Sequence, residues 1–168
     1  DEGDIVDFSE NRLKELLDTI EEVDGKVIIW CSYRHNIRKV IETLEKKFGA
    51  GSAEGFYGET PSKERPKILK NFMDPEHHMR FLVGHPRTGG YGLTLTIAKT
   101  MIFYSNEYDL EIREQAEARN HRIGTESKVT YVDLVCEGTV DENILKSLRK
   151  KINIATQIMG EEFKKWLI

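Results

Sequence analysis

The spacing of apolar side chains changes repeatedly between a helical and an extended pattern. Apolar residues three or four apart predict amphipathic helices over about 9–23, 37–48, 109–122 and 140–160. A further helix is expected to begin at Thr60 or Ser62 and to run to about Phe72, with Pro66 poorly placed inside it. Short runs rich in β-branched residues predict strands at 26–32, 54–57, 80–84, 100–104 and 129–135.

Strands that alternate with helices of this length predict a three-layer α/β fold. We expect a mostly parallel central sheet with helices on both faces. The 168 residues are enough for one core, so we expect a single domain over 1–168. Within it, 1–24 form an acidic leading segment and helix, and 139–168 form a C-terminal helical segment that a capping-box pattern at 139–142 opens.

Composition narrows the class of protein. The chain is 39% hydrophobic and 32% charged, as in ordinary globular domains, and no apolar run reaches the roughly 18 to 20 residues that span a bilayer. We therefore expect no membrane partner and no secretory signal. Cys31 and Cys136 are too few and too far apart for a disulfide framework or a zinc site, which favours reduced thiols. The chain begins at Asp1 without a methionine, which favours a fragment or a processed product.

The net charge of −4 is unevenly distributed. Residues 1–24 hold ten acids against Arg12 and Lys14, for a net charge of −8. The other 144 residues hold 23 Lys or Arg against 19 acids, for a net charge of +4. A mildly basic body of this kind is compatible with nucleic-acid phosphates but does not require them.

Two segments concentrate candidate chemistry. Three glycines between 89 and 92 follow a predicted strand, where close backbone N–H groups can bind an anion, although a purely structural turn is equally open. On the helix expected over 109–122, Gln115, Arg119 and Arg122 fall on one face beside an apolar stripe that contains Ala116. Paired guanidiniums on an exposed face can bind a polyphosphate through forked hydrogen bonds.

These segments carry a resemblance to superfamily 2 helicases. The sequence VIIWCSY at 27–33 resembles motif IV, GGYGLTLTIA at 89–98 resembles motif V, and QAEARNHRIG at 115–124 resembles motif VI. The segments 58–65 and 138–145 are similar to the Swi/Snf-type branch of double-stranded DNA translocases. The chain therefore resembles the C-terminal RecA-like lobe of such a motor, and its compact loops look more like phage or bacterial members.

Three positions depart from the pattern of that branch. Thr94 stands in place of the usual Asn, Thr125 replaces the Gln that commonly follows the motif VI glycine, and 85–88 differ from the usual lead-in to motif V. None of these changes removes a charged catalytic group. They affect the expected details of DNA contact and lobe coupling more than the class.

The resemblance implies an ATPase site shared between two lobes. ATP and Mg²⁺ would be bound mainly by a missing first lobe, with Gly90 and Gly92 beside the nucleotide. Arg122 would act as the arginine finger, Arg119 would assist it, and Gln115 would couple the site to motif V. No residue is assigned to a metal, because His77 and His78 lack partners at ligand spacing. The chain alone would be inactive.

The resemblance also implies partners. Double-stranded DNA would be contacted through its backbone, by residues at motif IV, at motif V and near the third helix: Ser32, Tyr33, Arg65, Thr88, Gly89 and Gly90. The other partner would be the N-terminal RecA-like lobe of the same polypeptide, and the isolated domain would be monomeric. The location would be cytoplasmic in a bacterium or phage-infected cell, and nuclear in a eukaryote.

Two other functions stay open. The chain could be a non-catalytic RecA-like module that docks on protein or nucleic acid, although such a module has no need for both arginines on one helical face. It could also be a small nucleotide-binding enzyme that uses the 89–92 loop. That enzyme needs an acidic residue at a strand end, whereas Asp133 is predicted inside a strand.

Overall fold

The computed structural model describes residues 8–88, 95–120 and 128–159, apart from the side chains of 8, 9 and 155–159. These residues form five helices and five strands, which alternate along the chain except that β4 follows β3. In chain order the elements are α1 (Phe8–Glu21), β1 (Val27–Trp30), α2 (Arg34–Phe48), β2 (Ala53–Phe56), α3 (Arg65–Met73), β3 (Phe81–Gly84), β4 (Thr100–Phe103), α4 (Leu110–Glu117), β5 (Thr130–Asp133) and α5 (Val140–Met159).

The five strands form one parallel sheet in the order β2-β3-β1-β4-β5. The central strand β1 is paired on both sides, with Val27 opposite Phe81 of β3 and Thr100 of β4. All four residues of β1 are fully buried, which explains its continuous apolar sequence. β5 lies at one edge of the sheet, where its residues are exposed or partly buried.

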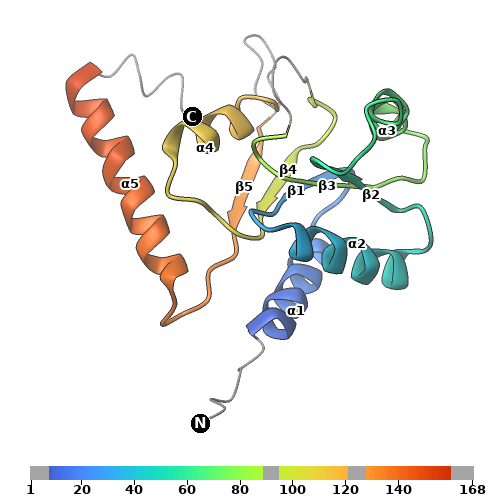
Figure 1. Cartoon of the computed structure of the whole chain (residues 1–168), viewed down its shortest axis with the longest axis horizontal. Coiled ribbons are helices and arrows are strands. Elements are labelled where there is room, and N and C mark those ends of the chain that lie inside the picture. The colour runs from blue at the N-terminus through green and yellow to red at the C-terminus, as the bar shows by residue number, and fades with distance from the viewer. Residues whose placement is uncertain (1–7, 89–94, 121–127, 160–168) are drawn as a thin grey trace.

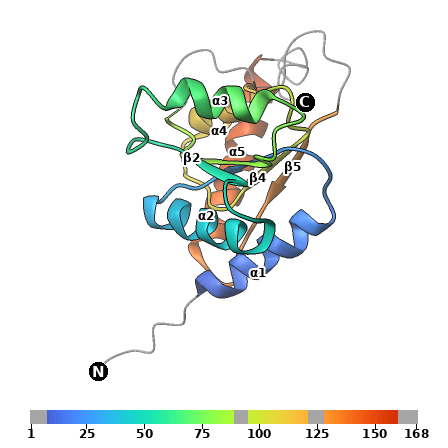
Figure 2. The same cartoon turned by 90° about the vertical axis from the view of Figure 1, so that its right-hand side faces the viewer.

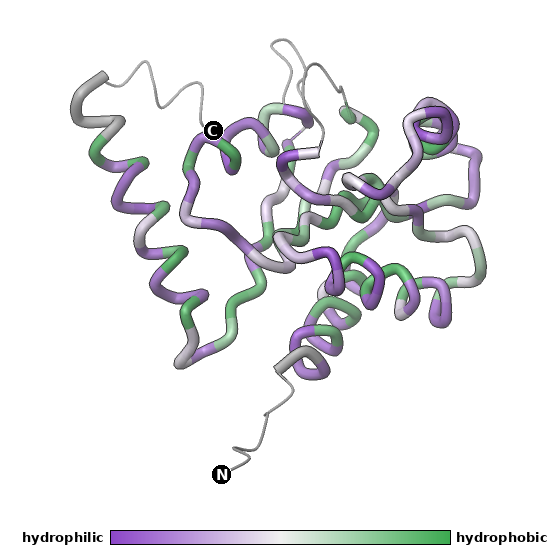
Figure 3. The backbone as a smooth tube through the Cα atoms, viewed as in Figure 1, coloured by the Kyte–Doolittle hydropathy of each residue, from purple (hydrophilic) through white to green (hydrophobic). Residues whose placement is uncertain are grey.

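Helices cover both faces of the sheet (Figures 1 and 2). Side chains alternate between the faces along each strand, so Val27 and Ile29 join a core with α1 and α2, whereas Ile28 and Trp30 join a core with α3 and α4. Apolar residues gather along the central strands, and the helices carry polar outer faces (Figure 3). The predicted three-layer α/β fold is confirmed.

Gly84 at the end of β3 shows why a glycine is needed there. A Cβ atom on this residue would lie 2.5 Å from the carbonyl oxygen of Phe56 in β2 and 3.0 Å from the Trp30 ring. Any larger residue would force the backbones of β2 and β3 apart.

The beginning of α3 corrects the sequence prediction. The helix begins at Arg65 rather than at Thr60 or Ser62, with Pro66 in its first turn, where a missing N–H costs no helical hydrogen bond. Thr60 instead closes the preceding turn. Its hydroxyl donates to the Gly55 carbonyl at 2.8 Å and accepts from the Tyr57 amide at 3.1 Å.

The last helix begins close to the predicted position. Thr139 precedes α5, and its hydroxyl accepts from the Asp141 amide at 3.3 Å. The Glu142 carboxylate accepts from the amide of Gly138 at 2.9 Å, one residue earlier than in a standard capping box. Among the described helices, none is long and apolar enough to cross a membrane.

Candidate functional site

The segments that follow β1, β3 and β4 meet at the carboxyl edge of the sheet, because parallel strands end at the same edge. Ser32 follows β1, and its amide donates to the Ser105 hydroxyl after β4 at 2.8 Å. The Ser32 hydroxyl donates to the Ser105 carbonyl at 3.1 Å. These two hydrogen bonds fix the position of the motif IV segment relative to β4.

His85 links the same edge to β3. The amide of Arg87 donates to His85 Nδ1 at 3.2 Å, which assigns the ring proton to Nε2 in the neutral imidazole. Nε2 then lies 3.1 Å from the Ser32 carbonyl oxygen and 3.4 Å from a carboxylate oxygen of Glu107. Arg87 also donates to Glu107 at 2.6 Å, and this hydrogen bond raises the pKa of the Arg87 guanidinium.

A hollow of about 230 Å³ opens at this edge, and we call it the edge hollow. It brings together two residues that the sequence assigned to DNA, Ser32 and Thr88, with the first turn of α2. Hydroxyls, a guanidinium and the N-terminus of a helix are groups that bind phosphate oxygens. The lining residues are Ser32, Arg34, Tyr57, Gly58, His85 and Thr88.

Arg34 is a candidate site residue that the sequence analysis missed. Its side chain is 70% exposed and lies 3.6 Å from Glu59, so it is only loosely paired. The signal that could have identified it is its position directly after motif IV. A residue in the first turn of α2 points toward the edge where β1 ends.

Two other residues assigned to DNA do not line the edge hollow. Tyr33 is 58% exposed, and its ring stacks on His35 with centroids 5.8 Å apart. The Arg65 guanidinium donates to the carbonyls of Thr60 at 3.1 Å and Tyr57 at 3.2 Å. Arg65 therefore holds the turn that carries Tyr57, and its contact with DNA stays a prediction.

Arg119 does not lie on an exposed helical face. The prediction that it shares one face with Gln115 is wrong because α4 ends at Glu117 and the chain turns before Arg119. Arg119 is 7% exposed and donates from Nη2 to the Pro86 carbonyl at 2.7 Å, while its Cζ lies 4.9 Å from the centre of the Trp30 ring. Burial lowers the pKa of this guanidinium.

One guanidinium nitrogen of Arg119 makes no hydrogen bond to the described residues. Nη1 is buried and has no hydrogen-bond partner among the described residues. A buried N–H without a partner is costly, so this atom is ready to bind an oxygen acceptor.

Gln115 lies apart on the surface, where its amide donates to Glu111 at 3.0 Å. The catalytic roles of Arg119 and Gln115 stay predictions.

Several predicted site residues lie outside the described residues. They are Gly89, Gly90, Gly92 and Arg122. Across the described ranges, there is no group of three or more His, Cys, Asp or Glu side chains that could bind a metal ion. His77 and His78 stack on each other with ring centroids 4.5 Å apart, and His77 Nδ1 accepts from the Met79 amide at 3.1 Å.

A second feature missed from the sequence is a partly buried ionic cluster around Arg113. This side chain, 11% exposed, donates to Asp133 of β5, to Glu117 of α4 and to Asn106 after β4. Its Cζ lies 3.5 Å from the centre of the Phe103 ring. Burial acts to lower the pKa of Arg113, but the bonds and charges of Asp133 and Glu117 outweigh it and raise that pKa.

The fold and the site residues agree with a family match. The family described as Helicase conserved C-terminal domain matches residues 10–124, so the chain belongs to this family. The resemblance to the C-terminal lobe of Swi/Snf-type helicases is thereby confirmed, and the chain is homologous to lobes of that kind.

Particular relatives point in the same direction. The chain is 34% identical over 108 residues to "Chromatin-remodeling ATPase INO80" of Homo sapiens, which is 64% of this chain and 7% of that protein. It is 40% identical over 108 residues to the protein of the same name in Drosophila melanogaster, again 64% of this chain and 6% of that protein. It is 30% identical over 147 residues to "Protein CHROMATIN REMODELING 19" of Arabidopsis thaliana, which is 88% of this chain and 19% of that protein. The chain thus spans less than a fifth of these relatives.

A solved structure confirms the fold. The chain superposes on the structure titled "Crystal structure of the C-terminal part of Fun30 ATPase domain" with a TM-score of 0.69 at 22% identity, covering 82% of this chain and 44% of that one.

The three relatives compared above come from animals and a plant. A phage or bacterial source stays a prediction that these relatives do not support.

Proposed function

We propose that this chain is the second motor lobe of an ATP-dependent Swi/Snf-type translocase of double-stranded DNA. The lobe contacts the DNA backbone and supplies arginine side chains to ATP and Mg²⁺, which a first lobe of the same polypeptide binds. The family match over residues 10–124 and relatives that are named as ATPases support the proposal.

The edge hollow is the single observation that carries the proposal for DNA. Ser32 and Thr88 are 56 positions apart in the sequence, yet both line it, together with Arg34. Phosphate contacts of this kind place a protein on DNA without reading bases, as a translocase requires. Tyr33, Arg65 and the motif V glycines Gly89 and Gly90 would extend the contact along the backbone.

Arginine side chains are the lobe's contribution to hydrolysis. Arg122 is the arginine finger, and such fingers contribute about 10³- to 10⁵-fold in rate in other nucleotide hydrolases. Arg119 assists through its unpaired Nη1, which a phosphate oxygen would satisfy. Gln115 couples this side of the site to the loop that contains Gly90 and Gly92.

Partners and compartment follow from this assignment. The lobe binds double-stranded DNA and the N-terminal RecA-like lobe of its own polypeptide, and alone it is monomeric. The compartment is the nucleus for a eukaryotic source and the cytoplasm for a bacterial or phage source.

The alternative, a docking module without catalysis, now depends on Arg122 alone. Arg119 stacks on Trp30 and bonds Pro86, so a docking module would also have a structural reason to keep it. Arg122 lies outside the described residues, so its substitution is the experiment that separates the motor from the docking module.

The test is made in the intact polypeptide, with its first lobe. Arg122→Ala should lower DNA-stimulated ATP hydrolysis by about 10³-fold or more while ATP affinity changes little. Arg149→Ala, which removes an exposed arginine of α5, is the control and should leave hydrolysis unchanged. Loss of ATP binding in Arg122→Ala would assign a structural role instead, and unchanged hydrolysis would favour the docking module.

A further inference from the structure

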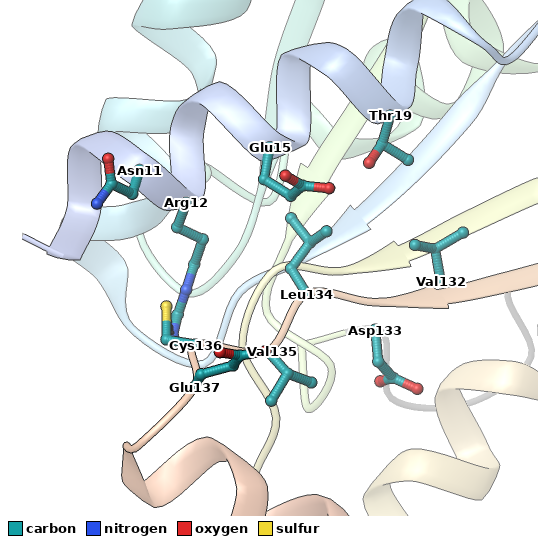
Figure 4. A pocket seen from close by; sticks show the side chains of 10 residues that line it. All are labelled: Asn11, Arg12, Glu15, Thr19, Val132, Asp133, Leu134, Val135, Cys136 and Glu137. Atoms are coloured by element: carbon teal, nitrogen blue, oxygen red, sulfur yellow. Dashed lines mark hydrogen bonds between the residues drawn. The ribbon is translucent and has the colours of Figure 1, made fainter.

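A second hollow, larger than the edge hollow, lies between α1 and the end of β5. Its volume is about 510 Å³. Asn11, Arg12, Glu15 and Thr19 line it from α1, and the segment 132–137 lines it from β5 and the chain beyond (Figure 4). We call it the α1–β5 groove. It shares no lining residue with the edge hollow, and the motor assignment does not use it.

One wall of the groove is the outer edge of the sheet. The amides of Thr130 and Leu134 donate to the carbonyls of Lys99 and Phe103 beside β4. In a parallel ladder, alternate residues of a strand bond to the same neighbour. The backbone groups of Asp133 and of its neighbours two positions away therefore face outward, and no described strand pairs with them. Such an edge can accept one more extended chain.

The charges along the groove are acidic and partly unpaired. Arg12 is the only base among the described residues that line it, and it is already paired with Asp141 and also donates to the Cys136 sulfur at 3.1 Å. Asp133 is held by Arg113. The carboxylates of Glu15 and Glu137 have no partner among the described residues, and both residues are exposed.

We propose that the α1–β5 groove binds an extended, lysine- or arginine-bearing segment of a partner protein. The segment adds to β5 as an edge strand through the outward backbone groups around Asp133. Every second side chain of such a strand faces α1. A basic side chain there lays its alkyl stem over Val132 and Leu134 and places its charge beside Glu15 or Glu137.

The negative charges of the groove favour a basic segment over an acidic or an uncharged one. An acidic segment would meet the two unpaired carboxylates, and an uncharged strand would leave them unpaired. The rest of α1 and the turn after it add to the same field, because their exposed side chains include Glu10, Asp18 and Glu22 against a single exposed lysine, Lys14.

The test uses the 168-residue chain and a labelled nine-residue peptide of alternating lysine and valine, with fluorescence anisotropy as the readout. An otherwise identical peptide of glutamate and valine is the first control. We expect the basic peptide to bind and the acidic peptide not to bind. Glu15→Lys combined with Glu137→Lys should weaken binding of the basic peptide by at least about tenfold.

A matched variant separates the groove from the general charge of the chain. Asp18→Lys with Glu22→Lys makes the same change in the net charge of the chain, on α1 and in the turn directly after it, but neither residue lines the groove. It should weaken binding by less than about threefold, the residual effect of exposed charges. An equal loss in both double variants would overturn the proposed site, as would binding of the acidic peptide or no binding of the basic one.

Strand pairing is tested through the peptide backbone. Methylation of alternate peptide nitrogens blocks pairing only when those nitrogens face β5. One of the two possible methylation patterns should therefore abolish binding, and the other should keep it. Equal affinity for both patterns would rule out an added strand. Self-association of the chain that Glu15→Lys with Glu137→Lys abolishes would assign the groove to a second copy instead.

Discussion

At the scale of single residues, Arg119 shows how tertiary contacts redirect a side chain. Its guanidinium lies over the Trp30 ring and donates to the Pro86 carbonyl, so it connects the end of α4 with the turn after β3. Thr88 of that turn lines the edge hollow. Arg119 therefore contacts the turn that carries Thr88. Its Nη1 has no hydrogen-bond partner among the described residues and is available to another ligand.

The two cysteines should differ strongly in reactivity. Cys31 is fully buried, and burial raises the pKa of its thiol, so little thiolate forms and reagents cannot reach it. Cys136 is only partly buried and lines the α1–β5 groove. In the native chain we expect one thiol to react with a disulfide reagent, at least about 10³-fold faster than the other, which must wait for opening of the core.

The assignment of the two rates can be checked by substitution. Cys136→Ser should remove the fast phase, and Cys31→Ser should leave it unchanged. Adding denaturant should make both thiols of the wild-type chain react. Equal rates in the native chain would contradict the burial of Cys31.

At the scale of elements, α4 is held by an ionic cluster as well as by apolar packing. Asp109 caps the helix by accepting from the amides of Glu111 and Ile112. Arg113 then connects the helix to β5 through Asp133, and Ala116 is buried against the sheet. This attachment fixes the direction in which the chain leaves α4 toward Arg119.

Removing Arg113 should destabilise the fold. Arg113→Met leaves the carboxylate of Asp133 partly buried without its main partner, which should lower the free energy of unfolding by about 3 kcal/mol. Adding Asp133→Asn should restore part of the loss, because the carboxylate of Glu117 is then the one charge of the cluster left without its partner. Urea unfolding followed by circular dichroism measures both changes.

The matched control for this pair is Arg149→Met on the exposed face of α5, which should change the free energy of unfolding by less than about 0.5 kcal/mol. A similar small change for Arg113→Met would mean that the cluster contributes little to stability.

At the scale of the whole molecule, the residues proposed to contact DNA and the residues proposed to contact ATP lie on segments that are in contact with each other. The edge hollow and the Arg119 contacts both lie at the carboxyl ends of the parallel strands. Ligands of open α/β sheets bind outside this edge. The proposed DNA and ATP contacts are therefore close enough to affect each other through the 85–88 turn.

The lobe alone should not hydrolyse ATP. No phosphate-loop lysine motif occurs anywhere in the 168 residues, so we expect ATP to be bound mainly by the proposed first lobe. We expect the purified chain to show no ATP turnover above background, with or without double-stranded DNA, in an assay of released phosphate. Turnover at the rate of an intact motor would contradict the shared site.

A first lobe added in the same polypeptide should restore DNA-stimulated turnover. This positive control shows that the purified chain fails because it lacks the other half of the site, and not because it is misfolded. Urea unfolding of the isolated chain tests its folding independently.

The sequence by itself determined the elements and the family. The apolar run of β1 predicted a central strand, and the motif VI segment identified the class. Helical spacing predicted α5 almost to the residue and the end of α2, which begins at Arg34 rather than at the predicted Ile37. These are local properties, because side-chain periodicity and motif chemistry depend on residues that are neighbours in the sequence.

Only the tertiary structure decided which residues meet. The strand order β2-β3-β1-β4-β5 brings Ser32 beside Ser105 and Thr88 into one hollow with Arg34. The early end of α4 turns Arg119 inward onto Trp30, which a helical projection places on an exposed face. Periodicity cannot predict such contacts because they depend on distances between segments far apart in the chain, and these are set by how the strands pair and the helices pack.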